Sequence, residues 1–92
     1  MEFLKDGILY NTKTSVKIGG PIQQHCEEGY YYESLYLSKN KQYYLLYTSR
    51  DILFSHPTDV KVLSDDEAFR WAAKYLSAGI VKKHFSDKIK EG

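Results

Sequence analysis

Seven of the nine tyrosines in this chain of 92 residues fall between residues 30 and 47, in two segments that have the composition of β-strands. The segments run from Tyr30 to Leu37 and from Gln42 to Ser49, and the polar connection of residues 38–41 is short enough for a hairpin. Side chains alternate across an extended chain, so both faces of the second segment carry tyrosine or leucine. We expect this hairpin at the centre of an antiparallel sheet, where its tyrosines are either covered or exposed as a row.

The chain opens with a second hairpin pattern. Phe3–Lys5 and Ile8–Tyr10 flank the dipeptide Asp6-Gly7, which tolerates the positive φ angles of a type I′ turn. The alternation in residues 14–18 then predicts a strand with one buried face, ended by Gly19-Gly20-Pro21. The stretch from Ile22 to Gly29 shows no period of either kind, and we expect a loop there.

The C-terminal third predicts helix. Val60, Val62 and Leu63 supply a last short strand, and Ser64-Asp65-Asp66-Glu67 is a capping box that starts a helix at Asp65. The apolar residues that follow recur at helical spacing, so we expect an amphipathic helix over residues 65–77, ended by Gly79, and a short helical segment over residues 80–86. The expected fold is a single α+β domain, residues 1–92, with four to five antiparallel strands and one helix across one face.

The composition of the chain argues against a nucleic-acid-binding, exported or membrane-spanning protein. Thirteen basic and twelve acidic residues give a net charge of +1, which lacks the strong positive field of a nucleic-acid-binding protein. Cys26 is the only cysteine, the opening residues lack the pattern of an export signal, and no apolar run approaches the roughly 20 residues of a membrane span. We expect a soluble protein of the bacterial cytoplasm.

His25, Cys26, Glu27 and Glu28 are adjacent residues with side chains that can bind metal or act in catalysis. Neighbouring residues of an extended segment point to opposite faces, and zinc ligands usually come in pairs two to four residues apart. We therefore expect no catalytic residue, no metal site and no cofactor, and we interpret Cys26 as a small buried residue.

The tyrosine hairpin is the predicted contact surface. A helix can cover only one face of the sheet, so tyrosines on the opposite face need another partner: a second copy of the chain, a host protein, or the loop from Gly20 to Gly29. Tyrosine is enriched at the energetic centres of protein interfaces, which favours a protein partner. The residues expected to touch it are Tyr31, Tyr36, Tyr43, Tyr47, Lys39, Asn40, Lys41, Glu27, Glu28 and Glu33.

Two other interpretations of the same tyrosines stay open. Together with Lys39 and Lys41 they resemble a surface on which a single-stranded nucleic acid stacks. Alternatively, most of them are half-buried packing within the sheet.

The order of these signals resembles a group of short proteins carried by phages and other bacterial mobile elements, which includes anti-CRISPR proteins. The resemblance lies in the strand Leu9–Ser15 with Ile18-Gly19, the segment Glu33–Tyr36, the segment Tyr43–Leu46 and the helix start Val62–Trp71. It departs from the family in two turns, where Asn11 replaces an aspartate and Asn40 replaces a glycine. The resemblance implies a non-catalytic inhibitor that binds a CRISPR-Cas subunit stoichiometrically.

Overall fold

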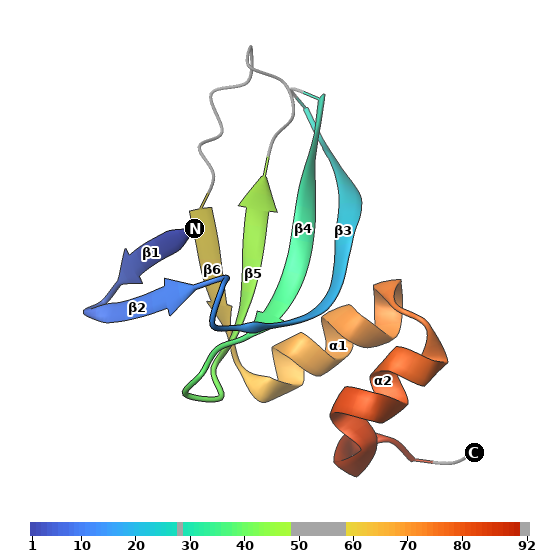
Figure 1. Cartoon of the computed structure of the whole chain (residues 1–92). Helices are drawn as coiled ribbons and strands as arrows, with labels where there is room; N and C mark the ends of the chain where they lie inside the picture. The colour runs from blue at the N-terminus through green and yellow to red at the C-terminus, as the bar shows by residue number, and fades with distance from the viewer. Residues whose placement is uncertain (28, 49–58, 91–92) are drawn as a thin grey trace.

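A computed structural model describes residues 1–27, 29–48 and 59–90, and it confirms an α+β fold (Figure 1). Four strands form an antiparallel sheet in the order β3-β4-β5-β6, and β1 and β2 form a separate two-stranded sheet. The strands are β1 Glu2–Lys5, β2 Ile8–Asn11, β3 Val16–Cys26, β4 Gly29–Leu37, β5 Tyr43–Thr48 and β6 Asp59–Leu63. The helices are α1 Asp65–Tyr75, α2 Ala78–Phe85 and a 3-10 turn, Ser86–Lys88.

The tyrosine-rich hairpin forms the centre of the sheet, as predicted. β4 and β5 pair with Leu35 opposite Leu45, and both residues are buried. The turn between them is closed by the Ser38 hydroxyl, which accepts a hydrogen bond from the Gln42 amide at 3.0 Å, and Lys41 takes a positive φ of 65°. β4 and β5 carry apolar or aromatic residues on both faces, and such strands are stable only where both faces of the sheet are covered. Their composition therefore favours the two inner positions of the sheet.

Residues 19–26 belong to β3, so the predicted strand end at Gly19-Gly20-Pro21 and the predicted loop from Ile22 were both wrong. β3 pairs with β4 from Val16 to Cys26, with register shifts between Lys17 and Ile22 that take up extra residues. Burial does alternate at residues 22–26, but polar side chains occupy both kinds of position. Backbone pairing with β4 holds this segment in the sheet, and its sequence shows no alternation of apolar and polar residues.

The hairpin of β1 and β2 covers the sheet face that α1 leaves open. Asp6 and Gly7 both have positive φ, 51° and 78°, which confirms the predicted turn. Tyr10 packs into a buried cluster with Tyr44, Leu46 and Val60 of the sheet.

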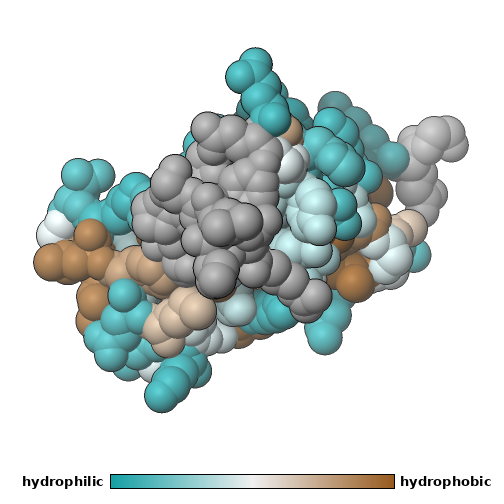
Figure 2. Space-filling view, turned by 90° about the horizontal axis from the view of Figure 1, so that it is seen from above, coloured by the Kyte–Doolittle hydropathy of each residue, from teal (hydrophilic) through white to brown (hydrophobic). Residues whose placement is uncertain are grey.

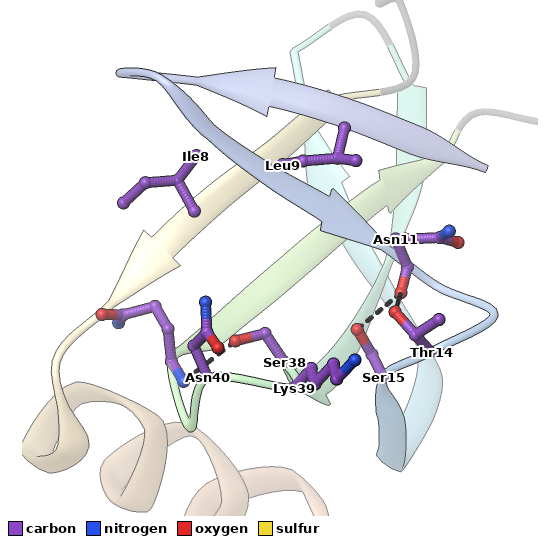
Figure 3. A pocket seen from close by; sticks show the side chains of 9 residues that line it. Ile8, Leu9, Asn11, Thr14, Ser15, Ser38, Lys39 and Asn40 are labelled. Carbon is purple, nitrogen blue, oxygen red and sulfur yellow. Dashed lines mark hydrogen bonds between the residues drawn. The ribbon is translucent and has the colours of Figure 1, made fainter.

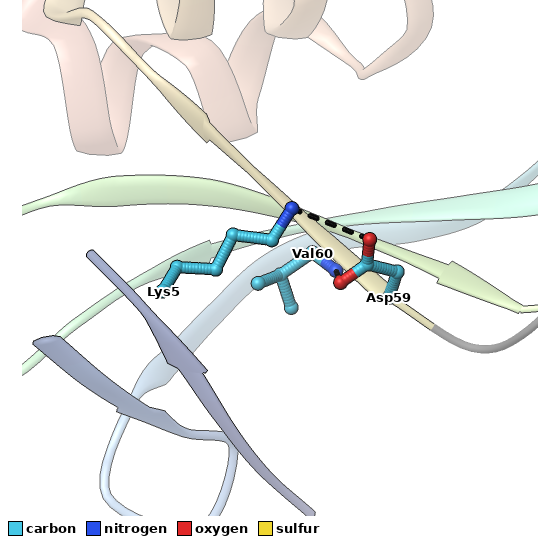
Figure 4. Close-up of polar contacts among 3 residues, drawn as sticks. All are labelled: Lys5, Asp59 and Val60. Atoms are coloured by element: carbon cyan, nitrogen blue, oxygen red, sulfur yellow. Dashed lines mark hydrogen bonds and ion pairs between the residues drawn. The ribbon is translucent and has the colours of Figure 1, made fainter. Parts of the chain in front are cut away.

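An ion pair also joins this hairpin to the sheet. The Lys5 ammonium donates to the Asp59 carboxylate at 3.3 Å, beside the Val60 amide that donates to the same carboxylate at 2.8 Å (Figure 4). The Val60 amide, followed by Lys5, lowers the pKa of Asp59. Because both charged side chains are exposed to solvent, this pair orients the hairpin more than it stabilises it.

The helices cover the other face at one end of the strands. Ser64 and Glu67 form the predicted capping box, with hydrogen bonds of 3.0 and 3.1 Å, and Ala68 and Ala72 of α1 are buried against Leu35 and neighbouring residues. The predicted helix end was wrong in detail: α1 stops at Tyr75, and Gly79 lies inside α2. Ser77 caps α2 by accepting from the Ile80 amide, so a second N-cap replaces the expected glycine stop. Within the described residues, no helix has the length and apolar content to cross a bilayer.

Candidate functional site

The register of β4 and β5 distributes the tyrosines over both faces of the sheet. Tyr31, Tyr43 and Tyr47 lie on the face that carries α1, and Tyr36 lies on the opposite face, stacked on Tyr44 at 5.4 Å under the β1–β2 hairpin. The expectation that the proposed contact tyrosines share the face opposite the helix was therefore wrong. All four are partly buried, and Tyr30 is the one tyrosine in the exposed class.

Three of the predicted contact residues lie close together beside α1, at the end of the sheet face that α1 does not cover. α1 crosses the strands at the end where β4 leads into β5, so no described helix lies over the opposite end of that face (Figure 1). Tyr31 and Glu33 of β4 and Tyr47 of β5 lie there, and Trp71 and Tyr75 of α1 lie along the border. We call these five residues, with Gln24 of β3 opposite Tyr31, the tyrosine–glutamate cluster.

Glu33 is the charged centre of this cluster. Glu33 is only 7% exposed, and its Oε1 accepts a hydrogen bond from the Trp71 indole nitrogen at 3.3 Å. Tyr47 is the cross-strand partner of Glu33 on β5. No lysine, arginine or histidine of the described chain forms an ion pair with this carboxylate. A buried carboxylate is costly unless it is paired or hydrogen-bonded, so the hydrogen bond from Trp71 offsets part of the cost of burying this charge.

The rings of the cluster contact each other at their edges. The ring centroids of Tyr31 and Tyr47 lie 5.8 Å apart in a T-shaped arrangement, and those of Trp71 and Tyr75 lie 5.3 Å apart. The Lys74 ammonium lies 5.2 Å from the centroid of the Tyr75 ring, a cation–π contact at the border of the cluster. Burial, followed by the Glu33 charge, raises the pKa of Tyr31.

Tyr47 gives this site a measurable pH dependence. Burial, followed by the charges of Glu33 and Tyr31, raises the pKa of Tyr47 from 10.0 to about 12. Folding therefore favours the neutral phenol, and the stability that Tyr47 contributes is complete below pH 10 and is lost as the pH rises through 12. Urea midpoints measured between these pH values should fall more steeply for the native protein than for Tyr47→Phe. Equal slopes would show that Tyr47 ionises as in the unfolded chain.

The other predicted contact residues lie elsewhere. Tyr43 packs against Phe85 of α2, with ring centroids 5.3 Å apart, and so belongs to the core. Glu27 is exposed in the turn directly after β3, Lys41 is exposed in the turn between β4 and β5, and Glu28 lies outside the described residues.

Lys39 and Asn40 line a small pocket of about 180 Å³ between the two hairpins. Figure 3 shows Ile8 and Leu9 of β2 on one side and Ser38, Lys39 and Asn40 on the other. Asn11, Thr14 and Ser15 close one end, where the Ser15 hydroxyl donates to the Asn11 carbonyl at 2.7 Å. This pocket lies at the end of β4 that is remote from Tyr30 and Tyr31, so Lys39 does not share a surface with these two tyrosines.

The outer face of the β1–β2 hairpin carries apolar side chains that sequence reasoning did not single out. Leu4 and Leu9 are cross-strand partners on this face and are 73% and 57% exposed, whereas Ile8, 48% exposed, lies on the same face as Tyr10. In Figure 2 apolar surface gathers at the end of the molecule that Figure 1 shows as the hairpin. The alternation of side chains along the two strands predicts this surface. Because Phe3 and Tyr10 face the sheet, Leu4 and Leu9 face outward.

Metal binding has no candidate among residues 1–27, 29–48 and 59–90, where no three His, Cys, Asp or Glu side chains lie close enough to hold an ion. Within that same part of the chain, His25 is exposed and Cys26 is a partly buried free thiol on β3.

Sequence reasoning also missed the contributions of Trp71, Tyr75 and Gln24 to the cluster. Trp71 and Tyr75 are four residues apart on the apolar side of the predicted helix, which placed them near the sheet but did not show which strand residues they would meet. Gln24 lay in the segment predicted as a loop, so nothing in the sequence brought it next to Tyr31.

Comparison with protein families, with curated proteins and with solved structures finds no match to this chain.

Proposed function

We propose that this protein acts by non-catalytic, stoichiometric binding of a protein partner, and that the tyrosine–glutamate cluster is the centre of its contact surface. The observation that carries the proposal is the buried carboxylate of Glu33, set among partly exposed aromatic rings at the end of the sheet face that no described helix covers. Tyrosine and tryptophan supply large, rigid contact area and dominate the energetic centres of interfaces.

The proposed target is a subunit of a bacterial CRISPR-Cas effector, which makes the protein an inhibitor encoded by a phage or another mobile element. This part of the proposal rests on the order of motifs along the chain. A domain of this size can block a large complex by occupying a surface that the complex needs, and such inhibition requires no turnover.

A nucleic-acid partner has less support. Stacking on single strands needs exposed rings next to a basic groove. The rings of Tyr31 and Tyr47 are partly buried against each other beside Glu33, and Lys39 lies at the other end of β4.

The test is binding of the purified full chain to purified single-subunit and multisubunit CRISPR effectors, measured as affinity and as inhibition of target cleavage. We expect Tyr31→Ala to weaken binding to the target effector by about tenfold or more, the effect typical of an interface centre. Tyr30→Ala is the matched control, because Tyr30 is the exposed neighbour on the other face of the same strand. Its affinity should stay within about twofold of the native protein.

Two results would contradict the proposal. Absence of binding to every effector type would remove the proposed target. Equal losses from Tyr31→Ala and Tyr30→Ala, with both variants folded by circular dichroism, would remove the cluster as the contact surface.

A further inference from the structure

The tyrosine–glutamate cluster has an unbalanced set of hydrogen-bonding and charged groups. A carboxylate offers about four acceptor positions, and the hydrogen bond from the Trp71 indole takes up one of them in the described chain. On the neighbouring strand, Gln24 has a buried side-chain nitrogen, Nε2, with no hydrogen-bond acceptor in the described structure. The cluster therefore holds both unused acceptor capacity on an anion and an unused donor.

The rings around Glu33 favour a particular kind of positive charge. The faces of tyrosine and tryptophan rings are electronegative and attract cations, and Lys74 already lies 5.2 Å from the Tyr75 ring centroid. A guanidinium group is planar, stacks on aromatic rings, is weakly hydrated and donates to a carboxylate through two parallel hydrogen bonds. An ammonium group is more strongly hydrated and loses more on entering such a site.

We infer that the cluster receives an arginine side chain of the protein partner, whose guanidinium contacts the Glu33 carboxylate between the rings of Tyr31, Tyr47 and Trp71. A peptide carbonyl next to that arginine accepts the hydrogen bond that Gln24 Nε2 lacks. This inference rests on the proposed binding function and deepens it, because it assigns the chemistry of the group that the partner presents.

Trp71 makes the inference directly measurable, since it is the only tryptophan in the chain and its indole nitrogen donates to Glu33. The experiment titrates the full-length, ¹⁵N-labelled protein with N-acetyl-arginine amide and follows the indole N–H resonance of Trp71 and the side-chain amide of Gln24. The neutral, nearly isosteric probe N-acetyl-citrulline amide is the matched ligand control, and N-acetyl-lysine amide tests the other cation.

We expect saturable shifts of both resonances with the arginine probe and an affinity at least tenfold weaker for citrulline, as a charge-assisted pair of hydrogen bonds implies. Glu33→Gln should weaken arginine binding by about tenfold or more, and Glu27→Gln, an exposed acid near the same end of the sheet, should leave it unchanged. The comparison of arginine with citrulline uses the native protein, so it decides the question even where Glu33→Gln does not fold.

Equal responses to arginine and citrulline, or stronger binding of lysine than of arginine, would overturn the inference. The proposed function fails separately. If effector binding depends on Tyr31 and the arginine probe does not bind, the inference alone falls, whereas arginine binding without any effector binding removes only the proposed function.

Discussion

Tyr44→Ala should lower the free energy of unfolding by about 3–5 kcal/mol, the cost typical of truncating a buried aromatic side chain. Tyr44 is fully buried, and its ring stacks on Tyr36 at 5.4 Å and lies 5.1 Å from Tyr10. Its hydroxyl donates to Ser15 Oγ at 2.7 Å. The truncation thus removes part of the packing between the β1–β2 hairpin and the sheet, including the contact of Tyr44 with Tyr10. Urea denaturation followed by circular dichroism measures the change.

Tyr44→Phe is the matched control, because it keeps the ring and removes only the hydrogen bond to Ser15. Its cost should be about 1 kcal/mol. A loss below about 1 kcal/mol for Tyr44→Ala would show that the hairpin does not pack on this face in solution.

Gly20→Ala is the second substitution with a large expected effect, about 2–5 kcal/mol of destabilisation. Gly20 has a φ of +108°, which a residue with a side chain adopts only under strain. A β-carbon there would also lie 2.7 Å from the Glu33 carbonyl oxygen and 2.8 Å from the Ser34 α-carbon. Both neighbours are backbone atoms of β4, so the strands must separate to admit the methyl group.

Gly79→Ala is the control for this prediction. Gly79 lies inside α2 with no atom within 4 Å of an added β-carbon, so alanine there should raise the stability by up to about 1 kcal/mol. Opposite signs for the two glycines are the expected result in urea denaturation. Equal effects would show that the close approach of β3 to β4 at Gly20 does not persist in solution.

The parts of the fold that could be predicted from sequence are those with a local physical cause. The capping box at Ser64, the Asp6-Gly7 turn and the central tyrosine hairpin each depend on a few neighbouring residues, and each is present. The second half of β3 depends instead on pairing with β4 across two register shifts, and no local pattern encodes such pairing.

The candidate site was predictable in composition but not in arrangement. Tyr31, Glu33 and Tyr47 were among the residues expected to touch a partner, and the structure brings them together. The face on which they lie depends on the strand register, because a shift of one residue turns each side chain to the other side of the sheet. The predicted free face is instead occupied by the β1–β2 hairpin, which alternation alone could not place there.

The irregular course of β3 has a consequence for behaviour at high concentration. β3 is an outer strand of the four-stranded sheet, and an outer strand with unpaired amides and carbonyls can template the addition of strands from other molecules. Pro21 has no amide hydrogen to offer, and the shifts around Gly19 interrupt the ladder that an incoming strand would need to follow. This border of the sheet is thus protected against edge-to-edge aggregation by the residues that were predicted to end the strand.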